Sequence, residues 1–191
     1  MTVKELITSS RSYRSFDPST PISREQLVSF VDCARLSPSS RNLQPLKFRL
    51  VTEHSELDTM LSSTRWAGLL ADMEIPPKGH APTAYIVICL DTNIASTPAP
   101  FQRDVGITAQ SILLAATEAG YGGCMIGSFS AEEVKKGLSL PTYLSPQLVL
   151  GMGNPDETVE LVVLPNDGNI AYYRKDGVHY VPKRNLEELI V

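Results

Sequence analysis

The chain has 191 residues, which is long enough for a sizeable core, and its 42% apolar and 20% charged residues are ordinary for a globular domain. A net charge of −4 and a pI near 5.4 argue against nucleic acid or a membrane surface as a partner. No apolar run approaches the roughly 20 residues of a membrane span, and the N-terminal ten residues lack the apolar core of a signal peptide.

The cysteines are three, an odd number, and they are widely spaced at Cys33, Cys89 and Cys124. This pattern disfavours a disulfide framework or a zinc site and fits a reducing compartment. We therefore expect a cytoplasmic protein.

The first half of the chain predicts a short opening helix at 3–7 and an extended turn region at 11–21, which contains two prolines. Ser23 and Gln26 fit a capping box, and apolar residues at helical spacing continue from there to about Leu36. Shorter apolar runs then predict a strand at 48–51 and a helix at 55–61.

The second half contains the strongest element signals. The run at 85–90 is apolar on both faces, which is typical of a central strand. Residues 105–119 predict a long helix closed by Gly120, and its all-round hydrophobicity indicates burial within the domain or between subunits. Further signals are strands at 124–126 and 147–150 and a second capping box at Ser130 and Glu133.

The C-terminal region predicts a hairpin, because residues 171–173 and 178–181 flank an Asp176-Gly177 pair. Asn185 and Glu188 are spaced to cap a last, half-buried turn. A two-stranded hairpin is weak alone, so we expect it to pack on another part of the protein or on a second subunit. No composition shift marks a domain boundary, and the order of elements predicts one α+β domain with a mixed sheet.

The usual catalytic signatures are absent from the sequence: it contains no G-x-S-x-G, no H-E-x-x-H and no Walker A motif. The glycines of GYGGCMIG follow a predicted helix instead of opening one, which disfavours a Rossmann fingerprint. His54, His80 and His179 are isolated, and each fits a surface or hairpin position better than a catalytic base. Asp104 reads most simply as a favourable charge at a helix N-terminus.

Three polar clusters remain. Arg11 and Arg14 lie three residues apart, and a turn could bring both guanidinium groups onto one anion. The loop at 38–44 carries more hydrogen-bonding side chains than a connector needs, and Lys183 and Arg184 follow near the C-terminus. Each cluster alone is more often a solvated surface. Together they suggest one phosphate-bearing ligand rich in hydrogen-bonding groups.

At these residues the chain resembles the FMN-dependent nitroreductases. The segments that carry the resemblance, in the family's order and spread over almost the whole chain, are SRSYRSF, SPSSRNLQPLKF, DVGITAQSILLAATEAGYGGCMIGSF, VLGMGNP and VPKRNLEEL. The resemblance implies a nitroreductase-like α+β fold over 1–191, with a mixed central sheet flanked by helices. It also implies an intertwined homodimer, two flavin sites at the subunit interface, and a C-terminal segment of about 165–191 that packs on the partner.

The resemblance also implies cofactor-binding residues. Lys183 and Arg184 would hold the phosphate, Arg14 would face the N1–C2 carbonyl side of FMN, and the backbone of Gly127 and Ser128 would reach N5 and O4. The full set is Arg11, Ser12, Tyr13, Arg14, Pro38, Ser39, Ser40, Asn42, Gln44, Met125, Ile126, Gly127, Ser128, Lys183 and Arg184, of which 38–44 would come from the other subunit. Ser10 departs from the family pattern, since it stands where the family has its first arginine.

The implied activity is a ping-pong transfer of a hydride from NADH or NADPH, through FMN, to a nitroaromatic, a quinone or a similar small acceptor. The absence of a catalytic triad fits this activity, because the cofactor is the reactive group and no side chain needs to be catalytic. Two alternatives stay open: other FMN chemistry on the same scaffold, such as dehalogenation or flavin breakdown, and a flavin-binding protein that is no enzyme. No metal is expected.

Overall fold

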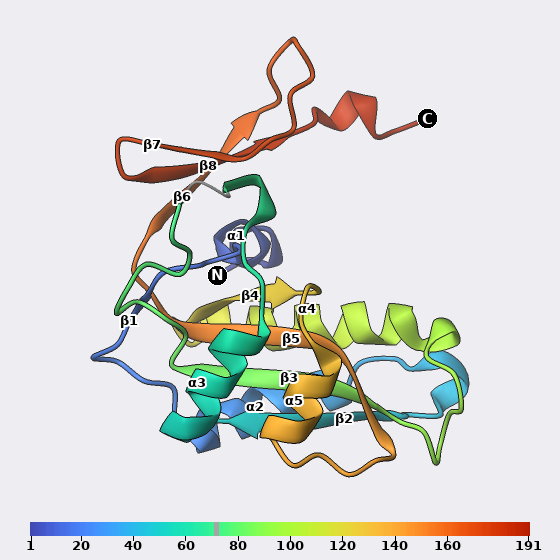
Figure 1. Ribbon diagram of the computed structural model, residues 1–191. Helices are drawn as coiled ribbons and strands as arrows, with labels where there is room; N and C mark the ends of the chain where they lie inside the picture. The colour runs from blue at the N-terminus through green and yellow to red at the C-terminus, as the bar shows by residue number, and fades with distance from the viewer. Residues whose placement is uncertain (71–72) are drawn as a thin grey trace.

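A computed structural model describes residues 1–70 and 73–191 of the chain (Figure 1). The fold is of the expected α+β class, with a central sheet between two layers of helices. The helices are α1 (Val3–Ser9), α2 (Arg24–Arg35), α3 (His54–Ser63), α4 (Gln102–Glu118) and α5 (Ala131–Gly137). The strands are β1 (Phe16–Asp17), β2 (Leu46–Val51), β3 (Ala84–Asp91), β4 (Gly122–Ile126), β5 (Leu144–Pro155), β6 (Thr158–Val163), β7 (Tyr173–Lys175) and β8 (Val178–Lys183).

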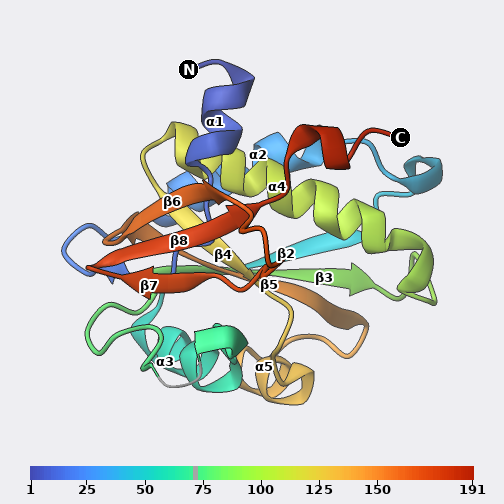
Figure 2. The same ribbon diagram turned by 90° about the horizontal axis from the view of Figure 1, so that it is seen from above.

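The central sheet is built around β3, which is buried along its whole length as the sequence predicts. Among the described residues, β3 lies between β2 and β5, and the far edge of β5 pairs with β4 and then with β1, all antiparallel. Successive side chains of β3 point to opposite faces. Ile86 and Ile88 therefore pack under α2 and α4, while Tyr85 and Val87 pack under α3 and α5. Figure 2 shows the two helix layers on either side of the sheet.

Both capping signals mark the helix starts correctly, but only one of them forms a complete capping box. Ser23 and Gln26 form both bonds of the predicted capping box, and α2 ends within a residue of the expected end. At α5, Ser130 accepts a hydrogen bond from the amide of Glu133, but the second bond of the predicted capping box is not formed. The Ser130 side chain therefore caps α5 without the help of Glu133.

The long helix α4 begins three residues before the predicted start and is followed by Gly120 at a φ of +85°. Its apolar residues face the sheet, whereas Gly106, Ile107 and Gln110 are exposed in the single chain. Within a single chain the predicted burial is found on the face toward the sheet, and burial of the other face between subunits stays a prediction.

The C-terminal region forms a second sheet in which β8 lies between β6 and β7. The hairpin at Asp176-Gly177 is confirmed, and both turn residues have positive φ. Strand β6 was not predicted from the sequence; it pairs in parallel with β8 and turns the weak hairpin into a three-stranded sheet. Asn185 and Glu188 do cap a final turn, but this turn is exposed and not half-buried as predicted.

The second sheet lies above the β4 edge of the central sheet in Figure 1 and over the middle of the molecule in Figure 2. This arrangement creates a space between the two sheets, which the chain segment before β1 and the side of α4 also border. Within the described residues, no helix is long and apolar enough to cross a membrane.

Candidate flavin site

The segment that follows α1 is held against the edge of β4. Ser12 forms a parallel bridge with Gly123, and the amide of Tyr13 donates to the carbonyl of Gly123 at 3.1 Å. The same amide also donates to the carbonyl of Arg11 at 3.0 Å, so residues 11–13 form a γ-turn. This turn brings Arg11, Ser12 and Arg14 to one pocket, as the sequence analysis allowed.

Tyr13 anchors this segment and does not line the pockets described below. Its ring packs so closely on Gly122 that a Cβ there would lie 2.4 Å from Tyr13 Cδ2. Its hydroxyl donates to the carbonyl of Ser9 at 3.0 Å. Gly122 is therefore required by close approach, and Tyr13 fixes the position of the two arginines on either side of it.

The main pocket lies between the two sheets and has a volume of about 350 Å³. Its lining residues come from the post-α1 segment, α4, β4 and the second sheet: Ser10, Arg11, Ser12, Arg14, Gln110, Leu113, Met125, Tyr172, His179, Val181 and Lys183. Such a volume lies within the range of ligand pockets, roughly 300–1,000 Å³. The pocket thus gathers cations from positions up to 172 residues apart in the chain.

A second pocket of about 190 Å³ continues the first, since Arg14, Met125 and Tyr172 line both. Its other lining residues are Arg65, Trp66, Ala67, Gly68, Cys124, Ile126, Gly127 and Ser128. Neither the Gly127 amide nor the Ser128 amide has a hydrogen-bond partner among the described residues. Two free backbone donors therefore border the pocket at the turn between β4 and α5.

The arginines of the main pocket are only partly satisfied by the protein. Arg11 donates to the carbonyl of Ile7 at 2.7 Å, but its buried Nε has no partner in the described part of the chain. Burial lowers the pKa of Arg11, which indicates a charge that the protein has partly removed from water. Arg14 donates to the carbonyl of Ser12 and lies with its guanidinium carbon 4.9 Å from the centre of the Tyr172 ring.

A buried carboxylate, Glu157, joins the second sheet to the arginine segment. It accepts hydrogen bonds from the backbone amide of Arg14 and from the guanidinium of Arg174 on β7, and His179 of β8 lies 3.8 Å away. Burial alone would raise the pKa of Glu157, but His179, the Arg14 amide and the Arg174 charge together hold it below its ordinary value. Glu157 is therefore ionised at neutral pH and fixes the upper wall of the pocket over Arg14.

The polar loop after α2 lies elsewhere. Ser39 and the amide of Ser40 both donate to the buried carboxylate of Asp104, at 2.6 and 2.9 Å. Asp104 is in the first turn of α4, as expected, and it also holds this loop. Arg41, Asn42 and Gln44 have positive φ, a concentration of uncommon backbone conformations that is typical of functional loops.

In a single chain this loop does not reach the arginine segment. Pro38, Ser39 and Gln44 border a separate pocket at the N-terminal end of α4, and no residue of that pocket lines the two pockets beside β4. Figure 1 shows the loop and the post-α1 segment at opposite ends of α4.

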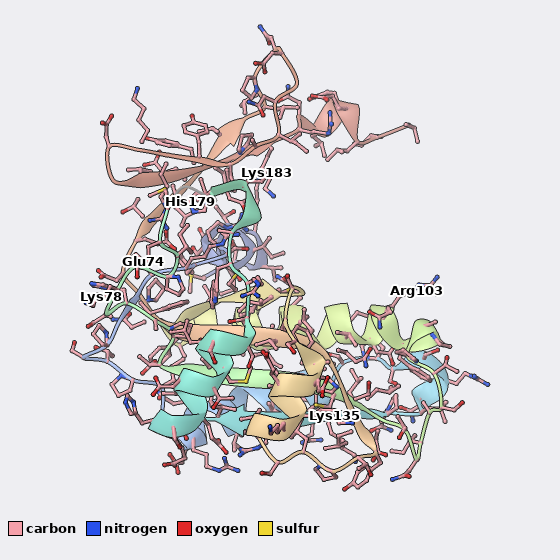
Figure 3. All side chains as sticks on the ribbon, in the orientation of Figure 1. Glu74, Lys78, Arg103, Lys135, His179 and Lys183 are labelled. Atoms are coloured by element: carbon pink, nitrogen blue, oxygen red, sulfur yellow. The ribbon has the colours of Figure 1, made fainter. Side chains whose placement is uncertain are left out.

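The two neighbouring cations near the C-terminus, Lys183 and Arg184, point to different sides of the chain. Lys183 lines the main pocket, and Figure 3 shows it on the side of the second sheet that faces the central one. Arg184, the next residue, instead pairs with Glu188 at 3.3 Å on the surface. Residues that are adjacent in an extended segment point to opposite sides, so only one of the two can face the pocket.

Some residues that α4, the second sheet and the α3–β3 connection bring to the site were not predicted from the sequence. These are Gln110, Tyr172, His179, Val181, Arg65 and Trp66. One signal was available, because His179, Val181 and Lys183 are alternate residues of one strand and must share a face.

The sequence model of the Nitroreductase family matches residues 7–154, so this chain belongs to the Nitroreductase family. A NADPH-flavin oxidoreductase of Vibrio harveyi is 29% identical over 171 residues, which cover 82% of this chain and 67% of that protein. The fold matches a nitroreductase family protein from Clostridium novyi NT with a TM-score of 0.67, at 24% identity, over 81% of this chain and 87% of that one. An FMN-dependent nitroreductase from Clostridium difficile R20291 matches with a TM-score of 0.63, at 23% identity, over 80% and 87% of the two chains.

Proposed function

We propose that this protein passes a hydride from NADH or NADPH, through bound FMN, to a nitroaromatic, a quinone or a similar small acceptor. The family and the names of its relatives support the broader statement that the chain is an NAD(P)H-dependent flavin oxidoreductase. Bound FMN supplies the chemistry, because its N5 accepts a hydride and its ring can return the electrons to a second substrate. The chain's own residues bind, orient and tune this group.

The observation that supports the proposal is the pair of connected pockets, because the main pocket suits the phosphate end of FMN and the second pocket suits its ring. Arg11 and Lys183 provide charge for a phosphate, and the unpartnered Nε of Arg11 is available to donate to it. Where the two pockets meet, Met125 and Tyr172 offer apolar surface for a flavin ring. The residues present therefore fit the cofactor.

The remaining groups would orient and tune the ring. Arg14, at the junction of the two pockets, would stabilise negative charge on the pyrimidine side of the reduced flavin. The free amides of Gly127 and Ser128 would donate to the N5–O4 edge, and a side chain at 127 is not needed for this. Ser12 would donate to the ribityl or phosphate part, and Ile126 would lie along the ring face.

A homodimer would complete the site. The proposal assigns Pro38, Ser39, Ser40, Asn42 and Gln44 to the partner's flavin. Within one chain that loop and the post-α1 segment lie toward opposite ends of α4, a helix of 17 residues and therefore roughly 25 Å long. A two-fold axis across the exposed face of α4 would place each loop beside the other chain's arginines.

The same proposal covers the organisation and location of the chain. Residues 1–191 form one FMN-binding domain, and the exposed apolar residues Leu186, Leu189 and Ile190 make the end of the 165–191 segment suitable for packing on the partner. Arg184 would then contribute to the phosphate only through a rearrangement of its pair with Glu188. The three cysteines are free, which suits a cytoplasmic protein.

The test of the activity is an anaerobic titration of the purified protein with NADH and with NADPH. The flavin absorbance near 450 nm should bleach with one of the two nucleotides and return when a quinone or a nitroaromatic is added. A yellow protein that neither nucleotide bleaches would be a flavin binder and not a reductase. A colourless protein that takes up no FMN would refute the proposed site itself.

Mixed dimers test the shared site. Arg14→Ala should damage the site from one side, and Asn42→Ala from the other. Each mixed dimer should contain one intact site of two. A 1:1 mixture with random subunit exchange, in which half of the dimers are mixed, should therefore recover about a quarter of the FMN that the wild-type dimer binds at the same FMN concentration. A monomer by sedimentation, or no recovery in the mixture, would contradict the dimeric arrangement.

A further inference from the structure

His179 is the most buried side chain of the main pocket that sequence reasoning did not assign to FMN. It lies on β8 with 1% of its surface exposed, and it lines the pocket together with Val181 and Lys183. Neither ring nitrogen has a hydrogen-bond partner among the described residues. A buried imidazole without a partner is unfavourable, so its position at the pocket wall indicates that a ligand supplies one.

The surroundings of His179 fix its ring. Nδ1 faces the Glu157 carboxylate at 3.8 Å, which is longer than a hydrogen bond. The edge of the ring meets Tyr172, with 5.3 Å between the ring centres. Arg174, the cross-strand neighbour of His179, donates its hydrogen bond to Glu157 and not to the imidazole. Nε2 is therefore the nitrogen left to a ligand.

The place of His179 along β8 decides which part of FMN it would meet. Lys183 is four residues further along the strand, roughly 13 Å away at about 3.3 Å per residue. Both His179 and Lys183 line only the main pocket, but the ring of His179 contacts Tyr172, which also lines the second pocket. His179 thus lies at the junction with Arg14, and Lys183 lies at the opposite, phosphate end. Figure 3 shows the two side chains separated along the second sheet.

We infer that His179 binds the flavin itself, by a hydrogen bond between Nε2 and the pyrimidine edge or the first ribityl hydroxyls, and not the phosphate. This inference rests on the proposed FMN site and adds to it. Arg14 of the post-α1 segment and His179 of the second sheet would then bind the same part of the cofactor from two sides. Glu157 contacts both residues and is the positioning residue for the pair.

Two flavins separate the roles of His179 and Lys183. Full-length wild type, His179→Phe and Lys183→Ala, each freed of flavin, are titrated with FMN and with riboflavin, which lacks the phosphate. His179→Phe should weaken both ligands by the same factor, roughly tenfold for one lost hydrogen bond to a buried group. Lys183→Ala should weaken FMN only. His179→Gln, which keeps a donor and an acceptor, should recover part of the affinity for both flavins.

The outcomes are distinct. If His179→Phe binds both flavins as wild type does, or loses affinity for FMN alone, the inference is overturned. If wild type binds neither flavin, the proposed function fails. If His179→Phe does not fold, the wild-type protein labelled with ¹⁵N-histidine answers the question. Riboflavin should then shift the ring nitrogens of His179, the one buried histidine of the three, and an unchanged His179 signal would also overturn the inference.

Discussion

Removal of the Glu157 carboxylate should destabilise the protein far more than removal of a surface charge. In Glu157→Ala the Arg14 amide and the Arg174 guanidinium lose their acceptor. The ion pair is largely buried, because the side-chain exposures are 5% for Glu157 and 19% for Arg174. Breaking a buried ion pair from one side costs about 3–5 kcal/mol. The matched control is Glu188→Ala, whose pair with Arg184 is about half exposed and should contribute about 0–1 kcal/mol.

The assay is urea unfolding of the flavin-free protein at pH 7, followed by circular dichroism. Glu157→Gln, which keeps the size and the acceptor oxygen but not the charge, should lie between wild type and Glu157→Ala. Equal losses of unfolding free energy for Glu157→Ala and Glu188→Ala would refute the reasoning, because they would mean that the charge cluster is not what holds the second sheet.

The contribution of Glu157 to the free energy of unfolding should fall as the pH is lowered. The folded-state pKa of Glu157 is lowered from 4.5, so the ionised carboxylate stabilises the folded state. That contribution is complete above 4.5 and is lost as the pH falls through the lowered pKa. The stability difference between wild type and Glu157→Gln should therefore shrink below pH 4.5, and a difference that grows there would contradict the assignment.

Two further variants test how the site is positioned. Gly122→Ala puts a methyl group 2.4 Å from Tyr13 Cδ2, and should cost about 1–3 kcal/mol in thermal unfolding and displace the arginine segment; an unchanged melting temperature would count against this close approach. Ser39→Ala removes a donor to the buried Asp104 and should cost about 1–3 kcal/mol in urea unfolding, whereas Ser40→Ala keeps the backbone donor and should change little; equal effects of the two would contradict the bonding described.

The sequence predicts much of the fold because its strongest signals are local. The apolar run of β3, the Ser23 cap and the Asp176-Gly177 turn each depend on neighbouring residues, and each is found. β6 was missed although four of its six residues are apolar: Val159, Leu161, Val162 and Val163. Its parallel pairing with β8 is set by chain segments about 20 residues apart, which no local pattern encodes.

The site residues also divide into those predicted by local sequence patterns and those brought in by distant parts of the chain. The convergence of Arg11 and Arg14 was foreseeable from their spacing, since a single turn suffices. Lys183 was suspected from its charge. Tyr172 and His179 come to the pocket only because the second sheet folds over β4, and Glu157 holds it there. Which of two adjacent cations, Lys183 or Arg184, faces the pocket depends on the register of β8, and that register follows from pairing with β6.

The affinity of Arg14→Ala for FMN tests the central claim, that the pocket between the two sheets binds the flavin. Arg14 lines both parts of the site, so the variant loses a charge-assisted, partly buried hydrogen bond worth about 1.5–3 kcal/mol. Quenching of FMN fluorescence should then report a dissociation constant roughly 10- to 150-fold higher than wild type. Arg24→Ala, at the exposed start of α2, should bind as wild type does. An Arg14→Ala variant that binds FMN as tightly as Arg24→Ala would contradict the account.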